Sequence, residues 1–190
     1  MTVDAMHRAR SWRGARLVVF WVVCVLAVLV DQVTKAAARA SLVSGQPQEF
    51  IPGVLDLSFV KNTGAAFSLG EGAGPVFIVF AAVVLAFGIW LVWSHDGLPM
   101  PLVVSVACVC GGGVGNMIDR MMFGYVTDFF ATTFMDFPVF NVADIFVTVG
   151  IVVSVILYLV MVDEPTVSAE AGEHPRTSVS SSSVGDSQDA

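Results

Sequence analysis

Long uncharged runs separated by short polar segments dominate the pattern of this chain. They contain fourteen, nineteen, twenty-one and eighteen residues, at Leu17–Val30, Pro75–Trp93, Leu98–Ile118 and Ile145–Val162. A helix of about 20 residues crosses the hydrocarbon core of a bilayer. The first run reaches that length only if its helix continues past Asp31. The pattern therefore predicts four transmembrane helices, over residues 17–38, 75–93, 98–118 and 140–162.

The segment between the first two spans, residues 39–74, follows a different pattern. Phe50–Val60 is rich in β-branched and aromatic residues and partly alternates in polarity, which predicts one or two short strands. The expected fold class is an α-helical polytopic membrane protein: four transmembrane helices with a small extracytoplasmic β element between spans 1 and 2. The expected domains are a basic leader (1–16), a four-helix membrane domain (17–162) and a disordered, acidic, Ser-rich tail (163–190).

Charge asymmetry predicts the orientation. Four of the nine basic residues lie in the first sixteen positions, at Arg8, Arg10, Arg13 and Arg16. The positive-inside rule makes this leader cytoplasmic, which places residues 39–74 and 119–140 outside and both termini inside. The leader and first run also fit a cleaved signal peptide. We favour a retained span because the polar DQVTK segment interrupts the run before any cleavage site.

Composition excludes an ordinary soluble domain. The chain is 56% hydrophobic and only 13% charged, with a mean hydropathy of +0.80, whereas soluble domains carry about 25% charged residues. The net charge of −7 comes mainly from the tail, since six of the sixteen acids follow Val162. We expect no nucleic-acid partner.

Cys24, Cys108 and Cys110 lie inside apolar runs and lack the loop spacing of a disulfide framework or zinc site.

Four aspartates, Asp119, Asp128, Asp136 and Asp144, follow one another between the third and fourth apolar runs. Because a carboxylate in or beside a span is costly, it indicates a functional site. Asp128 lies among apolar residues, which favours its protonated form. Either Asn141 or Asp144 fits as a cap of the fourth helix, but one cap does not explain both. Two neighbouring carboxylates would share a proton and support acid/base chemistry.

Two further polar segments precede these aspartates. Asp31 and Lys35 share a helical face, which is typical of a helix end where Lys35 reaches the lipid headgroups and forms an ion pair with Asp31; shaping the mouth of a site is the alternative. Asn62 offers both a hydrogen-bond donor and an acceptor, and Gly64 permits close backbone approach. The same N-T-G sequence is also a common turn.

The end of the third run carries Asn116 and Asp119 on one helical face, followed by Arg120. A structural Asp119–Arg120 ion pair at the membrane boundary and a catalytic role for Asp119 both fit this pattern. The spacing of Gly111 and Gly115 predicts a close helix–helix contact.

Metal, serine and cysteine chemistry find no support in the pattern. The three histidines, His7, His95 and His174, lie on the expected cytoplasmic side, away from the aspartates. No Ser–His pair or compact ligand set accompanies the acids. Carboxylates and amides are what remains at the outer surface.

Five motifs, in order, resemble those of lipoprotein signal peptidase, the bacterial signal peptidase II, an intramembrane aspartic peptidase. The similarity extends from about residue 16 to residue 162. Each motif is weakly specific alone, whereas five in the same order are highly specific. The motifs are DQVTK (31–35), KNTGAAFS (61–68), GGGVGNMIDR (111–120), VTDFF (126–130) and FPVFNVAD (137–144).

The resemblance implies a substrate, a site and a location. The substrate is a prolipoprotein carrying diacylglycerol on its lipobox cysteine, cut just before that cysteine, in the bacterial cytoplasmic membrane and near its outer surface. Asp128 and Asp144 fall on the catalytic pair, which shares one proton and activates water. The family adds no metal or cofactor, and its other partner is membrane lipid. Supporting or substrate-binding positions fall on Asn62, Gly64, Asn116, Asp119, Arg120, Asn141, Asp31 and Lys35.

Three other classes compete with this interpretation. A proton-coupled carrier would place its acids through the depth of the bilayer, and a scaffold protein would need neither Asp128 nor Asp144. A presenilin-type or prepilin-type aspartyl protease would carry a GxGD element, which this chain lacks.

Overall fold

The computed structural model describes residues 3–64, 73–95 and 97–162; the expected tail and most of the KNTGAAFS motif therefore lie outside the described residues. Within these ranges the main elements are four helices, α1 (Val3–Ser41), α2 (Gly74–Ser94), α3 (Met100–Phe123) and α4 (Val142–Val162). Each is long and apolar enough to cross a membrane, which confirms the predicted four-span architecture. The basic leader continues the first span without a break, since α1 begins at Val3.

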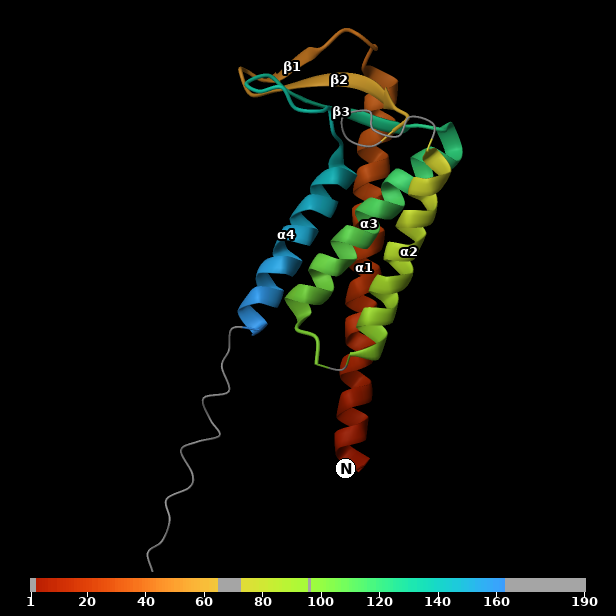
Figure 1. The fold of residues 1–190 in the computed structure, drawn as a ribbon, viewed down its shortest axis with the longest axis vertical. Coiled ribbons are helices and arrows are strands. Elements are labelled where there is room, and N and C mark those ends of the chain that lie inside the picture. The colour runs from red at the N-terminus through yellow and green to blue at the C-terminus, as the bar shows by residue number, and fades with distance from the viewer. Residues whose placement is uncertain (1–2, 65–72, 96, 163–190) are drawn as a thin grey trace, which may run out of the picture.

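Helix α3 occupies the centre of the bundle and packs against α1, α2 and α4 (Figure 1). Small residues on α3 allow this close approach. A side chain at Gly111 would meet the backbone of Cys24 on α1, and one at Gly112 would meet the backbone of Ala143 on α4. A side chain at Gly115 would collide with the Asp31 carboxylate. The small-residue spacing in α3 thus serves helix contact, as the sequence predicts.

A small antiparallel sheet covers the end of the bundle away from the N-terminus (Figure 1). Its order is β1 (Gln48–Ile51), β2 (Leu55–Asn62) and β3 (Val126–Thr132). The first two strands confirm the β element expected between the first two spans. The third was not predicted: the VTDFF segment pairs with β2, with Val126 opposite Asn62 and Thr127 opposite Lys61.

The connections of β3 bring the VTDFF and FPVFNVAD motifs, which carry Asp128 and Asp144, to this end of the bundle. Gly124 caps the end of α3 in a left-handed conformation, with φ of 77°, and returns the chain directly into β3. After the strand, Phe130 and Phe140 form an isolated antiparallel bridge just before α4 begins. Buried Phe129 packs with Ala38 and Leu42 and so anchors the sheet to the end of α1.

Candidate active site

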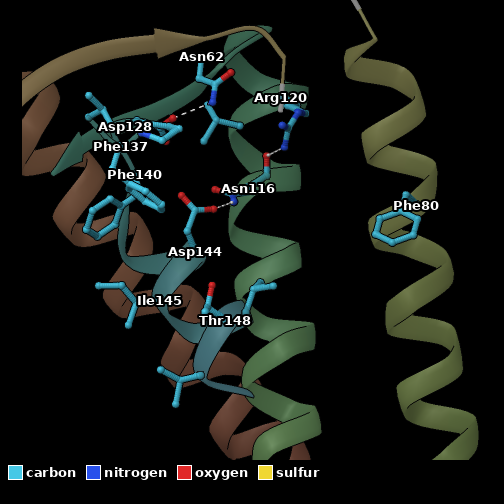
Figure 2. Close-up of a pocket in the computed structure, with 15 residues that line it drawn as sticks. Asn62, Phe80, Asn116, Arg120, Asp128, Phe137, Phe140, Asp144, Ile145 and Thr148 are labelled. Carbon is cyan, nitrogen blue, oxygen red and sulfur yellow. Dashed lines mark hydrogen bonds between the residues drawn. The ribbon is translucent and has the colours of Figure 1, made fainter. Parts of the chain in front are cut away.

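A pocket of about 650 Å³ lies beneath the sheet, against α3 and α4 (Figure 2). Its polar lining gathers at one end and its apolar lining extends along the helices. Figure 2 shows Asp128 above Asp144, with Asn116 beside Asp144. The polar residues that line it are Asn62, Asn116, Arg120, Asp128, Asp144 and Thr148, and the apolar ones include Phe80, Phe137, Phe140, Ile145 and Val149.

Asp128 reaches the pocket from β3 and is almost fully buried, with 2% of its surface exposed. Two side-chain amides hold its carboxylate: Asn62 donates to Oδ2 at 2.9 Å and Asn141 donates to Oδ1 at 2.6 Å. The pKa of Asp128 is raised to about 6, mainly by burial; the nearby charge of Asp144 also raises it, whereas the hydrogen bonds from Asn62 and Asn141 lower it. Asp128 is therefore a carboxyl able to hold or release a proton near neutral pH.

Asp144 lies in the first turn of α4, where the helix dipole stabilises negative charge. Its Oδ1 accepts a hydrogen bond from the Asn116 side chain at 2.8 Å, and its Oδ2 accepts one from the Asn141 backbone N–H at 3.0 Å. Asn141 Oδ1 in return accepts the Asp144 backbone N–H at 3.1 Å. Asn141 is thus the helix cap, and the same residue contacts both aspartates through different groups.

Asp31 and Lys35 lie beneath these amides, both fully buried. Lys35 Nζ contacts Asp31 at 2.9 Å and donates to Asn116 Oδ1 at 2.6 Å, which leaves the Asn116 amide free to donate to Asp144. Asp31 Oδ1 accepts the backbone N–H of Ala143 at 3.0 Å. The expected ion pair is confirmed, whereas the interpretation of Lys35 as a side chain reaching the headgroups is wrong, because the pair faces α3 and α4.

Asp119 and Arg120 have separate partners, so the ion pair between them, one of the two alternatives, is not found among the described residues. The fully buried Asp119 contacts Arg39 at 3.3 Å and accepts the Thr127 backbone N–H at 2.8 Å. Arg120 lines the pocket and donates from Nη2 to the Gly64 carbonyl at 2.8 Å. Gly64 also donates its N–H to Asn62 Oδ1 at 2.9 Å, which orients the Asn62 amide toward Asp128.

Several residues at this end of the bundle escaped the sequence analysis. Arg39 follows Lys35 by four residues and therefore shares its helical face, a signal that could have identified it. Gln32 donates to Asp119 Oδ1 at 3.3 Å, and no simple pattern marks it. Asp136, the fourth aspartate of the cluster, is exposed and does not line the pocket. Among the described residues, no group of three His, Cys, Asp or Glu side chains is arranged to hold a metal ion.

The fold and site define a polytopic membrane protein with one pocket at the end of its helix bundle, in which two aspartates accept hydrogen bonds from amide groups. The family model of signal peptidase (SPase) II matches residues 23–160. The chain belongs to this family, which makes it a peptidase and, with its four spans, a multi-pass protein of the bacterial inner membrane.

Similar proteins agree with this assignment. A lipoprotein signal peptidase of Enterococcus faecalis is 39% identical over 145 residues, covering 76% of this chain and 89% of the relative. One of Lactococcus lactis is 38% identical over 138 residues, covering 73% and 91%. Two solved bacterial membrane enzymes, determined in meso at 2.3 Å and 1.9 Å resolution, share the fold. Their TM-scores are 0.70 and 0.68 at 29% and 30% identity, over 76% and 74% of this chain and 89% and 92% of theirs.

Proposed function

We propose that this chain is an aspartic endopeptidase that removes the signal peptide from diacylglyceryl-modified prolipoproteins, cutting just before the lipidated cysteine. One observation carries the proposal: Asn141 donates its side-chain amide to Asp128 and its backbone N–H to Asp144, within one pocket. This arrangement fixes two carboxyl groups side by side, as acid/base hydrolysis requires. The relatives named lipoprotein signal peptidase support the substrate class.

The pair holds one proton, because the charge of Asp144 disfavours a second negative charge on Asp128. Asp128 is the better proton holder, since burial raises its pKa to about 6. Asp144 takes the other role, since the Asn116 side chain and the Asn141 backbone N–H hold its carboxyl group in the same pocket. These assignments make Asp128 the general acid and Asp144 the general base of the first step.

Hydrolysis then proceeds without a covalent intermediate. Water attacks the scissile carbonyl carbon while Asp144 takes one of its protons and Asp128 protonates the carbonyl oxygen. The tetrahedral diol collapses as the C–N bond breaks. The leaving amine takes the proton from Asp144, and the diol hydroxyl returns one to Asp128. The guanidinium of Arg120 lines the same pocket and stabilises negative charge on the oxygen as it develops.

The apolar part of the pocket fits a substrate that remains in the membrane. Phe80 of α2 and Ile145 and Val149 of α4 line the pocket below the carboxyl groups. A signal peptide helix and the acyl chains bury apolar surface against such walls, while the polar end receives the scissile bond. The positive-inside orientation puts this end at the outer surface, where a signal peptide ends its span.

The test is cleavage of matched substrates by purified protein. A diacylglyceryl-modified prolipoprotein and its unlipidated form are incubated with the enzyme in detergent, and the products are identified by mass spectrometry. We expect cleavage of the lipidated form only, with the modified cysteine as the new N-terminus. Equal cleavage of both forms, or cleavage at another bond, would contradict the proposed specificity.

A further inference from the structure

Arg39, in the last turn of α1, contacts two other elements at once. Its Nη1 lies 2.8 Å from Thr127 Oγ1 on β3 and 3.3 Å from Asp119 Oδ1 on α3. Its guanidinium carbon also lies 4.6 Å from the ring centroid of Phe123, the final residue of α3. Arg39 does not line the pocket, so these contacts concern the support of the site and not the substrate.

Arg39 contacts Thr127 both directly and through Asp119, and Thr127 directly precedes Asp128, a proposed catalytic residue. Helix α3 ends at Phe123 and β3 begins at Val126, so only two residues connect Asp119 and its helix to the strand that carries Asp128. Thr127 is fully buried and held twice: Asp119 accepts its backbone N–H at 2.8 Å, and Arg39 donates to its hydroxyl. The position of Asp128 therefore depends on this pair of contacts.

Charge balance gives Arg39 a second function. Two fully buried carboxylates, Asp31 and Asp119, have two cations beside them: Lys35, which is fully buried, and Arg39, whose side chain is 21% exposed. Lys35 Nζ is 2.9 Å from Asp31 but 4.0 Å from Asp119, so Arg39 is the nearer cation to Asp119. Without Arg39, the buried Asp119 would lose the only cation within 3.5 Å of it among the described residues, which is unfavourable.

We infer that Arg39 is a positioning residue for the cleavage reaction, fixing the start of β3, and with it Asp128, through Asp119 and Thr127. The inference rests on the proposed role of Asp128 as a catalytic acid. A cation in the last turn of a helix also stabilises the helix dipole. That effect requires only a positive charge near the helix end and does not account for the bridge between Asp119 and Thr127.

The first test separates kcat from KM on the diacylglyceryl-modified prolipoprotein. Because small displacements of a catalytic group reduce turnover strongly, Arg39→Met should lower kcat by about ten- to a hundredfold while KM stays unchanged. Arg39→Lys, which retains the charge, should recover part of the lost kcat. Asp136→Asn is the control: it removes an exposed charge that does not line the pocket and should leave both constants unchanged.

A double-mutant cycle tests the route through Asp119. Asp119→Asn keeps an acceptor for the Thr127 N–H but removes the charge that Arg39 balances. Adding Arg39→Met to this variant should lower kcat by much less than it does in the wild type. If the losses of kcat in the two single variants simply add in the double variant, the inference is contradicted. It is also contradicted if a raised KM and a lowered unfolding temperature account for the loss of activity in Arg39→Met.

Hydrogen exchange gives a readout that does not depend on cleavage. Arg39→Met should accelerate exchange at the backbone amides of Thr127 and Asp128, with helix α4 unchanged. Unchanged exchange and unchanged kcat would overturn the inference while leaving the proposed function intact. If the wild-type protein fails to cleave the prolipoprotein, the proposed function fails, and the exchange result alone decides whether Arg39 holds the strand.

Discussion

Replacing Asp128 with Asn tests whether its burial carries the energetic cost that the site geometry indicates. The ordinary carboxyl pKa is 3.8 and burial raises the pKa of Asp128 to about 6. At about 1.36 kcal/mol per unit, the difference corresponds to about 3 kcal/mol of folding free energy. Screening by solvent reduces this value little, because Asp128 is only 2% exposed.

The sign follows from proton linkage. Below about pH 3 the carboxyl is protonated in both the folded and the unfolded protein, so the favourable effect of the raised pKa is fully present. As the pH rises from about 4 to about 6, the unfolded chain releases the proton first and the folded state loses stability. Relative to wild type, the free energy of unfolding of Asp128→Asn should therefore rise by about 3 kcal/mol as the pH increases from about 3 to about 7.

The assay is reversible unfolding in mixed micelles at several pH values, with Asp128→Ala as a second variant. Both variants lack the ionisable group, so their stability differences from wild type should change with pH in the same way. They should differ by a constant offset, since Asn retains one acceptor for the donor amides of Asn62 and Asn141. A pH dependence identical in wild type and both variants would refute the proposed energetics of the site.

Two further substitutions, the first with a control, test the residues that hold Asp128 and Asp144 in place. Gly115→Ala should lower the free energy of unfolding by about 1–3 kcal/mol, because its Cβ collides with the Asp31 carboxylate. In Gly113→Ala the nearest atom is Ala81 Cβ at 3.9 Å, so unfolding should show no comparable loss, and equal effects would contradict this packing. Asn141→Ala removes the amide that contacts Asp128 and the cap of α4, and should lower kcat by about a hundredfold or more. A kinetic assay with normal turnover in this variant would show that the bridge is dispensable.

The sequence predicted the architecture because hydrophobic run length is a local property. It missed β3 because strand pairing is not: Val126 pairs with Asn62, far upstream in the chain. It also ended the third span at residue 118, whereas α3 continues to Phe123 and carries Asp119 and Arg120 on its last turns.

The sequence predicted which residues form the site better than it predicted the contacts between them. A membrane-spanning helix such as α1 carries apolar side chains on every face, so periodicity could not show that Asp31 and Lys35 face α3. The nearest basic neighbour in sequence suggested Arg120 as the partner of Asp119, whereas the fold supplies Arg39 from another helix. The choice of Asp128 and Asp144 as the catalytic pair came from the family resemblance and remains a prediction.

Turnover of the single variants Asp128→Asn and Asp144→Asn on a diacylglyceryl-modified prolipoprotein tests the central claim most directly. Each variant should insert into the membrane at the wild-type level and lose at least about a hundredfold in kcat, because general acid and base contribute on that scale. Full activity in either purified variant would contradict the assignment of the two carboxyl groups as the pair that cuts.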